Sequence, residues 1–240
     1  MPPEQRFEVE FEGRALRGDA FGPDLPAQAL LLHGGGKHHR GKMRPLRLDL
    51  LERGVGSWAF DFIGHGETGG ELKTSSLAER TAQAVAVIDA LGLAERGPLA
   101  LSAASMGAHT AVDLLERYEV DRLVLVVPAM YATAAQAVRF DQGFTEIIRR
   151  PQSWRGARGW EILRRFRGRL LVVAAELDDV IPEGVVELYG SSATNASESS
   201  TLILDGVGHM CFTELRERDP AAMQRVVDRI ADTLGLEVSA

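Results

Sequence analysis

One serine of the chain lies in a sequence context that could make it a nucleophile. Ser105 is the middle residue of the sequence AASMG, which follows a short apolar run and precedes a segment with helical spacing. A sharp turn from a strand into a helix needs small residues two positions before and after its central residue. It also exposes that residue at the N-terminus of the helix, where a developing negative charge is favoured. Ala103 stands where a glycine is usual, and the rival Ser102 falls inside the predicted strand that precedes the turn.

A nucleophilic serine needs an adjacent base, and the base needs a carboxylate to orient it. The last apolar run of the chain is followed by the sequence DGVGH, a glycine-flexed loop that ends in His209. The apolar run before it leads into ELDDVIP, which contains Asp178 and Asp179. We therefore expect His209 to take the proton of Ser105, with one of these two aspartates holding its imidazole.

The elements that must position these residues follow a regular alternation of strand and helix. Short apolar runs, typical of strands buried on both faces, lie at residues 29–32, 58–62, 99–101, 123–127, 170–175 and 201–204. Segments with helical spacing separate them, among them residues 77–91 and 108–118. Two alternating runs, residues 7–11 and 14–21, indicate an opening antiparallel hairpin. The pattern predicts an α/β fold with a mostly parallel sheet of about eight strands and helices on both faces.

The segment 130–168 interrupts this alternation of strands and helices, because a simple crossover between two strands needs far fewer residues. It is rich in aromatic residues and arginine, with helical spacing in parts. It is either a helical crossover packed on the sheet or a short helical lid over the carboxyl ends of the strands, where α/β proteins bind ligands. We favour the lid, with residues 1–129 and 169–240 as the core domain. The expected substrate-binding residues in the lid are Tyr131, Phe144 and Trp160.

Composition and charge favour a small-molecule partner. The net formal charge of -7 gives no electrostatic reason to expect nucleic acid or an anionic membrane as a partner. Cys211 is the single cysteine, which excludes an intramolecular disulfide, and we expect it to be a buried thiol. No apolar run is long enough for a membrane span and the N-terminus has no apolar leader segment, so a cytoplasmic protein is expected. A homodimer is left open.

Four motifs in register resemble the α/β-hydrolase superfamily, in its serine esterase type, over nearly the whole chain. Besides AASMG, they are GVGH before the last helix, DDVIP after the preceding strand and HGGG after the first buried strand. The resemblance favours Asp178 over Asp179 as the acid of the triad. It also implies an oxyanion hole formed by the backbone amides of Gly35 and Met106, with Gly36 as the alternative to Gly35.

This resemblance implies a reaction, which is cleavage of a small or medium carboxylic ester, thioester or lactone through an acyl-enzyme. There is a looser likeness to feruloyl and cinnamoyl esterases. The same site could serve an acyltransferase or a carbon-carbon hydrolase, and the same fold also occurs in proteins that bind a ligand without catalysis. No cofactor and no metal are expected, since no motif or histidine spacing indicates either.

Other histidines and a basic cluster need separate interpretation. His65, in a DFIGHGET segment that also resembles the superfamily, and His109, one turn after Ser105, are expected to be structural. Six basic residues lie in residues 37–44, directly after HGGG. They are either a solvated helix start or a dock for a substrate carboxylate or phosphate.

Overall fold

The computed structural model describes residues 4–235 and contains a sheet of eight strands. They are β1 (Glu4–Phe11), β2 (Arg14–Phe21), β3 (Ala27–Leu32), β4 (Val55–Phe60), β5 (Leu99–Ala104), β6 (Val120–Val126), β7 (Arg169–Ala175) and β8 (Glu198–Leu204). Their order is β1-β2-β4-β3-β5-β6-β7-β8. The pairs β1–β2 and β2–β4 are antiparallel and the other pairs are parallel, so the predicted fold class is confirmed.

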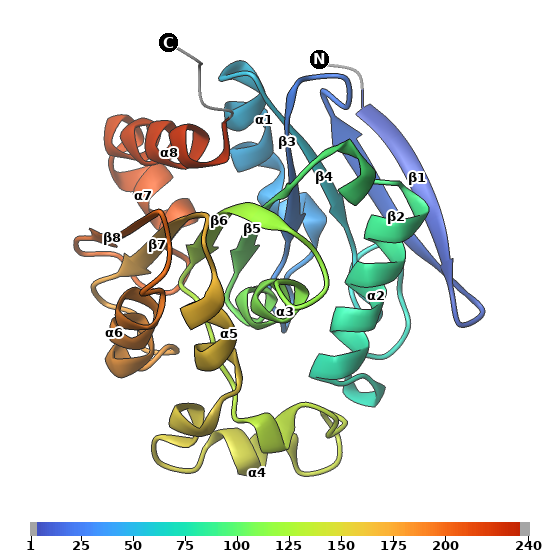
Figure 1. Cartoon of the computed structure of the whole chain (residues 1–240), viewed down its shortest axis with the longest axis vertical. Helices are drawn as coiled ribbons and strands as arrows, with labels where there is room; N and C mark the ends of the chain where they lie inside the picture. The colour runs from blue at the N-terminus through green and yellow to red at the C-terminus, as the bar shows by residue number, and fades with distance from the viewer. Residues whose placement is uncertain (1–3, 236–240) are drawn as a thin grey trace.

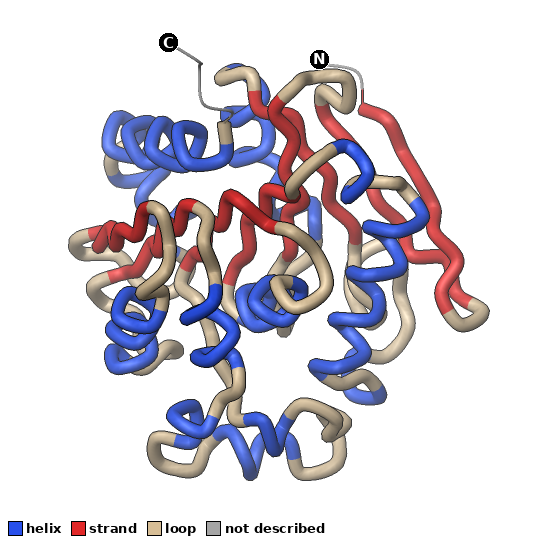
Figure 2. The backbone as a smooth tube through the Cα atoms, in the orientation of Figure 1, coloured by secondary structure: helices blue, strands red, loops and turns tan. Residues whose placement is uncertain are grey.

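Helices cover both faces of this sheet (Figures 1 and 2). On one face lie α1 (Arg44–Glu52), α7 (Cys211–Arg218) and α8 (Pro220–Leu234). On the other lie α2 (Leu77–Ala90), α3 (Met106–Leu114), α5 (Gly159–Arg165) and α6 (Glu183–Ser192). Successive strand residues point to opposite faces, so Leu30 joins the α2/α3 core and Leu31 joins the α1/α8 core. Within residues 4–235, no helix is long and apolar enough to cross a membrane.

The strand at the β8 end of the sheet differs from the expectation of burial on both faces. Ile203 is 58% exposed, whereas the strand residues Leu171, Val172 and Val173 of the neighbouring β7 are buried. The cause is position, because β8 is an edge strand and no further strand shields it. Only residues 193–197 connect the preceding helix to this strand, since α6 continues to Ser192 and β8 begins at Glu198.

The segment between β6 and β7 contains short helical turns. They are η4 (Thr133–Ala135), α4 (Phe144–Ile148) and η5 (Ser153–Gly156), and they precede α5. In Figure 1 the part around α4 projects beyond α3 and α5, away from the sheet. Phe144 and Ala135 of this segment pack against Leu77, the first residue of α2. The segment thus packs on the start of α2.

Candidate active site

Ser105 lies at a strained turn between β5 and α3. Its backbone has φ 50 and ψ -121, a conformation that residues other than glycine rarely adopt. A Cβ atom at Gly107 would come within 2.5 Å of the carbonyl oxygen of Leu32, so only glycine fits two positions after the serine. Ala103, in the position where glycine is usual, is accommodated as a 2% exposed core residue. The turn expected from the sequence AASMG is present.

The end of β6 holds this turn in place. The amide of Ser105 donates to the carbonyl oxygen of Val126 at 3.0 Å, and the carbonyl oxygen of Ser105 accepts from Ala129 at 3.1 Å. Between these two contacts, Val127 has φ 40, which is strained for a β-branched residue. A positive φ is not extended backbone, so β6 ends at Val126, one residue earlier than predicted.

The structure brings Ser105, His209 and Asp178 together in one line of hydrogen bonds. Nε2 of His209 lies 3.1 Å from Oγ of Ser105, and Nδ1 lies 2.9 Å from Oδ2 of Asp178. The side chains of His209 and Asp178 are 18% and 7% exposed. Asp179 is exposed. The arrangement can move a proton from the serine hydroxyl to the imidazole, with the carboxylate fixing which ring nitrogen is protonated.

Hydrogen bonds tie together the two loops that carry the acid and the imidazole. Oδ1 of Asp178 accepts from the amides of Val180 at 2.8 Å and Ile181 at 3.0 Å. The amide of Leu177 donates to the carbonyl oxygen of Val207 at 2.9 Å, which joins the loop after β7 to the loop after β8. The amide of Gly208, next to the histidine, donates to Glu214 of α7 at 2.8 Å. The relative position of Asp178 and His209 is therefore fixed by backbone contacts.

The loop at residues 33–36 lies directly against the turn that carries Ser105. A Cβ atom at Gly34 would be 3.1 Å from Cβ of Ser105, and one at Gly35 would be 3.2 Å from Sδ of Met106. Met106 begins α3, so its amide has no partner within the helix and is free to donate to an anion. Gly36 has φ 63 and open space around its Cβ position. This placement puts Gly35 closer to the turn than Gly36, and the role of its amide stays a prediction.

The histidines near this loop are neutral and buried. Nδ1 of His33 donates to the carbonyl oxygen of Gly34 at 2.7 Å, and its Nε2 accepts from the amide of Phe62 at 3.1 Å. Burial lowers the pKa of His33 well below its usual value, and the charge of Arg80 lowers it further. The ring of His65 lies 4.7 Å from that of His33, and burial lowers the pKa of His65 to about 4. Both rings act as packed structural groups.

His109, the other histidine expected to be structural, is held by the segment after β6. Its Nε2 donates to Oε1 of Gln136 at 2.7 Å, and its Nδ1 accepts from the amide of Tyr131 at 3.4 Å. Both ring nitrogens are thus used within the fold. In the part of the chain that the structure covers, no group of three or more His, Cys, Asp or Glu side chains could hold a metal ion.

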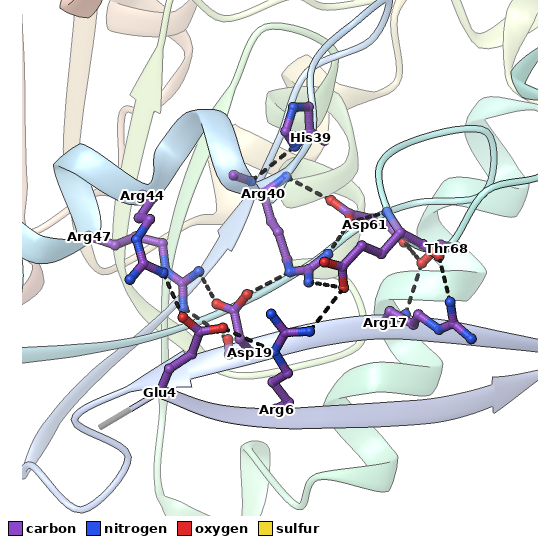
Figure 3. A network of polar contacts seen from close by, with 12 residues as sticks. Glu4, Arg6, Arg17, Asp19, His39, Arg40, Arg44, Arg47, Asp61 and Thr68 are labelled. Atoms are coloured by element: carbon purple, nitrogen blue, oxygen red, sulfur yellow. Dashed lines mark hydrogen bonds and ion pairs between the residues drawn. The ribbon is translucent and has the colours of Figure 1, made fainter. Parts of the chain in front are cut away.

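The basic cluster at residues 37–44 is, as a whole, neither a solvated helix start nor a dock for a substrate carboxylate or phosphate. Arg40 is buried, with Nε 2.6 Å from Asp19 and Nη2 2.6 Å from Glu67, and it also pairs with Asp61 (Figure 3). Although burial lowers the pKa of Arg40, its hydrogen bonds to Asp19 and Glu67 raise it overall. Arg44 pairs with Glu4 at 2.6 Å. These arginines are occupied in ion pairs, and no sequence pattern indicates their acidic partners.

A cavity of about 320 Å³ opens beside Ser105 and His209. It lies over the sheet between the start of α1 and α7, and its lining is mostly apolar. Members of this lining that the sequence did not single out are Leu31, Leu46, Val126, Val127 and Phe212. Lys42 and His38, from the basic cluster, lie at its wall, as does Cys211. No periodic signal distinguishes these apolar residues from ordinary core residues.

The three aromatic residues expected to bind substrate lie elsewhere. Tyr131 packs between His109 and Phe144, with ring centroids 5.5 Å from each. Trp160 is 6% exposed, packs on Tyr189 and donates from Nε1 to the carbonyl oxygen of Trp154 at 2.7 Å. None of Tyr131, Phe144 and Trp160 lines the cavity beside Ser105. Their contact with a substrate stays a prediction.

Comparisons with known proteins agree with this fold and assign a family. The family model described as serine aminopeptidase, S33, matches residues 24–158, which is more than half of the chain and includes Ser105. A structure of ferulic-acid-bound Est1E from Butyrivibrio proteoclasticus is similar, with 17% identity, a TM-score of 0.71, and coverage of 94% of this chain and 96% of that one.

Two further solved structures are similar at comparable levels. The Pyrococcus furiosus esterase Pf2001 has 20% identity and a TM-score of 0.71, with 97% and 92% of the two chains covered. A predicted CIB-like hydrolase from Thermoplasma acidophilum has 18% identity and a TM-score of 0.69, with 96% and 99% covered. No curated protein matches the chain in sequence. The resemblance expected from the motifs is confirmed, and the chain belongs to the serine aminopeptidase S33 family of α/β-hydrolases.

Proposed function

We propose that the protein is a serine hydrolase that cleaves a small or medium carboxylic ester, or a thioester or lactone, through an acyl-enzyme. The observation that carries the proposal is the hydrogen-bonded line from Ser105 through His209 to Asp178. A serine hydroxyl is a weak nucleophile unless such a base is in place. The similar structures include an esterase and a complex with ferulic acid, which supports an ester over other acyl substrates.

In the proposed reaction, Oγ of Ser105 attacks the carbonyl carbon of the ester as Nε2 of His209 removes the hydroxyl proton. Asp178 accepts the hydrogen bond from Nδ1 and stabilises the imidazolium. The amides of Gly35 and Met106 stabilise the oxyanion of the tetrahedral intermediate. His209 then gives its proton to the leaving alcohol, activates a water molecule by the same route, and water releases the acyl group.

We further propose that an apolar group of the ester occupies the cavity between α1 and α7. Its volume of about 320 Å³ is at the small end of the range for ligand pockets, which favours a compact substrate. Ser105 and His209 form one part of its wall, so a group seated there would remain attached to the reacting carbonyl. Two ester series, one varying the acyl chain and one varying the alcohol, will distinguish which side of the ester it holds.

The segment 130–168 is proposed as a lid. Tyr131 and Phe140 pack in the cluster that also contains Met106, the residue after the nucleophile. Movement of the segment would therefore uncover the Met106 side of the site, and Met106 does not line the cavity. The aromatic residues of this segment would then contact the part of the substrate that the cavity does not hold.

The test of the proposed reaction compares the wild type with Ser105→Ala on p-nitrophenyl acetate and butyrate, together with labelling by a fluorophosphonate followed by intact mass. We expect the wild type to turn over and to be labelled once, and kcat of Ser105→Ala to fall by about 10⁴-fold or more. Ser102→Ala, which alters the rival serine, should still be labelled. An aminoacyl p-nitroanilide assayed in parallel tests the amide cleavage that the family's description names.

Equal activity and equal labelling of the wild type and Ser105→Ala would reject Ser105 as the nucleophile. Absence of turnover and of labelling in the wild type would favour the ligand-binding alternative. Turnover of the anilide at a rate above that of the esters would replace the ester by an amide as the substrate. Products formed with added alcohols or amines would identify acyl transfer.

A further inference from the structure

Arg80 is a buried arginine that differs from the other buried arginines of the molecule. Its side chain is 0% exposed, and its guanidinium lies 3.8 Å from the centroid of the Phe62 ring. Arg40 and Arg47 are buried in ion pairs with Asp19. Within residues 4–235, Arg80 forms no ion pair, and its Nε and Nη1 have no hydrogen-bond partner. Burial of an unpaired cation is expensive, so its retention calls for a compensating role.

The contacts that Arg80 does make are with the glycine loop beside Ser105. Nη2 lies 2.8 Å from the carbonyl oxygen of His33 and 3.4 Å from that of Gly34. The carbonyl of Gly34 also accepts from Nδ1 of His33. The arginine, which comes from α2, therefore reaches across to hold two successive carbonyl groups of this loop.

The direction of each of these carbonyl groups determines the direction of the amide of the next residue, which belongs to the same peptide unit. The described residues contain no cis peptide bond, and in a trans peptide the N–H and the C=O point to opposite sides. Because the carbonyl of Gly34 points toward Arg80, the amide of Gly35 in the same peptide unit points away from it. Gly34 and Gly35 also lie against Ser105 and Met106.

We propose that Arg80 is a positioning residue for the oxyanion hole: it fixes the peptide between Gly34 and Gly35, and its charge strengthens the Gly35 amide as a donor. The inference rests on the proposed function, since it concerns the amide that would bind the oxyanion. A charged donor on a peptide carbonyl polarises the N–H of the same unit. Such a preorganised group acts on charge that develops only in the transition state, so its loss should lower kcat with little effect on KM.

The groups facing Arg80 leave its charge unopposed at neutral pH. They include His33, His65 and Tyr131, which share electrostatic interactions with it. Burial keeps both histidines neutral by lowering their pKa values, and it raises the pKa of Tyr131 to about 12. Burial also lowers the pKa of Arg80 to about 9, which still leaves it protonated at pH 7.

The experiment compares Arg80→Met, Arg80→Gln and Arg80→Lys, with Arg47→Met as the matched control. Arg47 is 1% exposed and lies in the ion-pair network of Figure 3. For each variant, kcat and KM for p-nitrophenyl butyrate are measured well below its melting temperature, and Tm is recorded separately. We expect Arg80→Met to lower kcat by about 10²-fold with KM within about threefold. Arg47→Met should lower Tm and retain kcat.

The remaining variants separate charge from packing. Arg80→Gln keeps a donor without the charge, and we expect kcat to fall by about tenfold or more. Arg80→Lys keeps the charge, so we expect it to recover part of the kcat that Arg80→Gln loses. If Arg80→Met does not fold, the comparison of Arg80→Lys with Arg80→Gln tests the proposal by itself. Two outcomes would overturn the proposal, provided that turnover still depends on Ser105. One is a kcat of Arg80→Gln equal to that of the wild type. The other is an equal kcat in Arg80→Lys and Arg80→Gln. Absence of Ser105-dependent turnover in the wild type would instead reject the proposed function.

Discussion

Oδ2 of Asp178 lies 2.9 Å from Nδ1 of His209, while Oδ1 of the same carboxylate accepts two backbone amides of its own loop. The carboxylate is therefore fixed from one side by the backbone and directed to the imidazole on the other. Asp179, one residue further along the chain, is exposed. The loop after β7 thus distinguishes two adjacent aspartates that have the same chemistry.

This difference predicts that the same substitution has a large effect at Asp178 and almost none at Asp179. Asp178→Asn should lower kcat for p-nitrophenyl butyrate by about 10³- to 10⁴-fold, because an amide cannot select the imidazole tautomer that accepts the serine proton. Asp179→Asn should stay within about twofold of the wild type, as expected of a surface change. A larger loss in Asp179→Asn than in Asp178→Asn, in proteins of equal Tm, would assign the acid to Asp179 instead.

The cavity between α1 and α7 predicts a change in chain-length preference. Leu46 lines the cavity, whereas Leu48 lies on the same helix and does not. Leu46→Trp should fill part of the cavity and lower kcat/KM for p-nitrophenyl octanoate by about tenfold or more, while acetate is cleaved at about the wild-type rate. Leu48→Trp is the matched control and should retain the wild-type preference. Parallel loss on acetate and octanoate would mean that Leu46→Trp disturbs the site itself.

The opposite result would place the apolar group of the substrate at the proposed lid. If Leu46→Trp retains the octanoate rate while Phe144→Ala changes it, the apolar group lies under the segment 130–168. Phe144 is 4% exposed and packs with Leu77, so a stability measurement must accompany this variant.

The fold could be predicted from the sequence because its strands are buried by their neighbours. β5, β6 and β7 read as unbroken apolar runs, and each lies between two other strands with helices on both faces. β8 carries a similar run, although Ile203 is 58% exposed. The run predicts a strand but not its place in the sheet, because edge position depends on which strands pair.

The proximity of Ser105, Asp178 and His209 could be predicted for the same reason, since each residue follows a recognisable strand. Arg80 could also have been noticed, because it stands on the buried face of α2 together with Leu77, Ala84 and Val87. A charged residue in such an apolar stripe indicates a specific buried contact. The ion pairs of Arg40 with Asp19 and Asp61 could not be found in this way. They join residues from separate elements, and no local pattern records the pairing.

Cys211 provides a prediction on reactivity. Burial raises the pKa of its thiol to about 12, so at pH 8 only a very small fraction is the reactive thiolate. We expect iodoacetamide to leave the native protein unmodified over an hour at pH 8 and to add one group per chain in urea. Mass spectrometry measures both. Rapid modification of the native protein would show that the cavity wall opens often enough to expose this thiol.

The ion pairs of Asp19 in β2 with Arg40 and Arg47 lead to a prediction about stability. Asp19 accepts from both Arg40 and Arg47, and all three side chains are at most 8% exposed. Asp19→Asn leaves two buried guanidinium groups without this carboxylate. We expect it to lower the free energy of unfolding by about 3–5 kcal/mol, as measured by urea denaturation.

A surface pair provides the control for this loss. Arg139 and Asp141 are 44% and 31% exposed, so Asp141→Asn should cost no more than about 1 kcal/mol. The two losses should also differ in their response to salt. Added NaCl screens the exposed pair but hardly reaches the buried one, so the effect of Asp19→Asn should persist at high ionic strength. If Asp19→Asn costs as little as Asp141→Asn, Asp61 and Glu67 are sufficient partners for Arg40, Ser57 is sufficient for Arg47, and the stability does not depend on the Asp19 carboxylate.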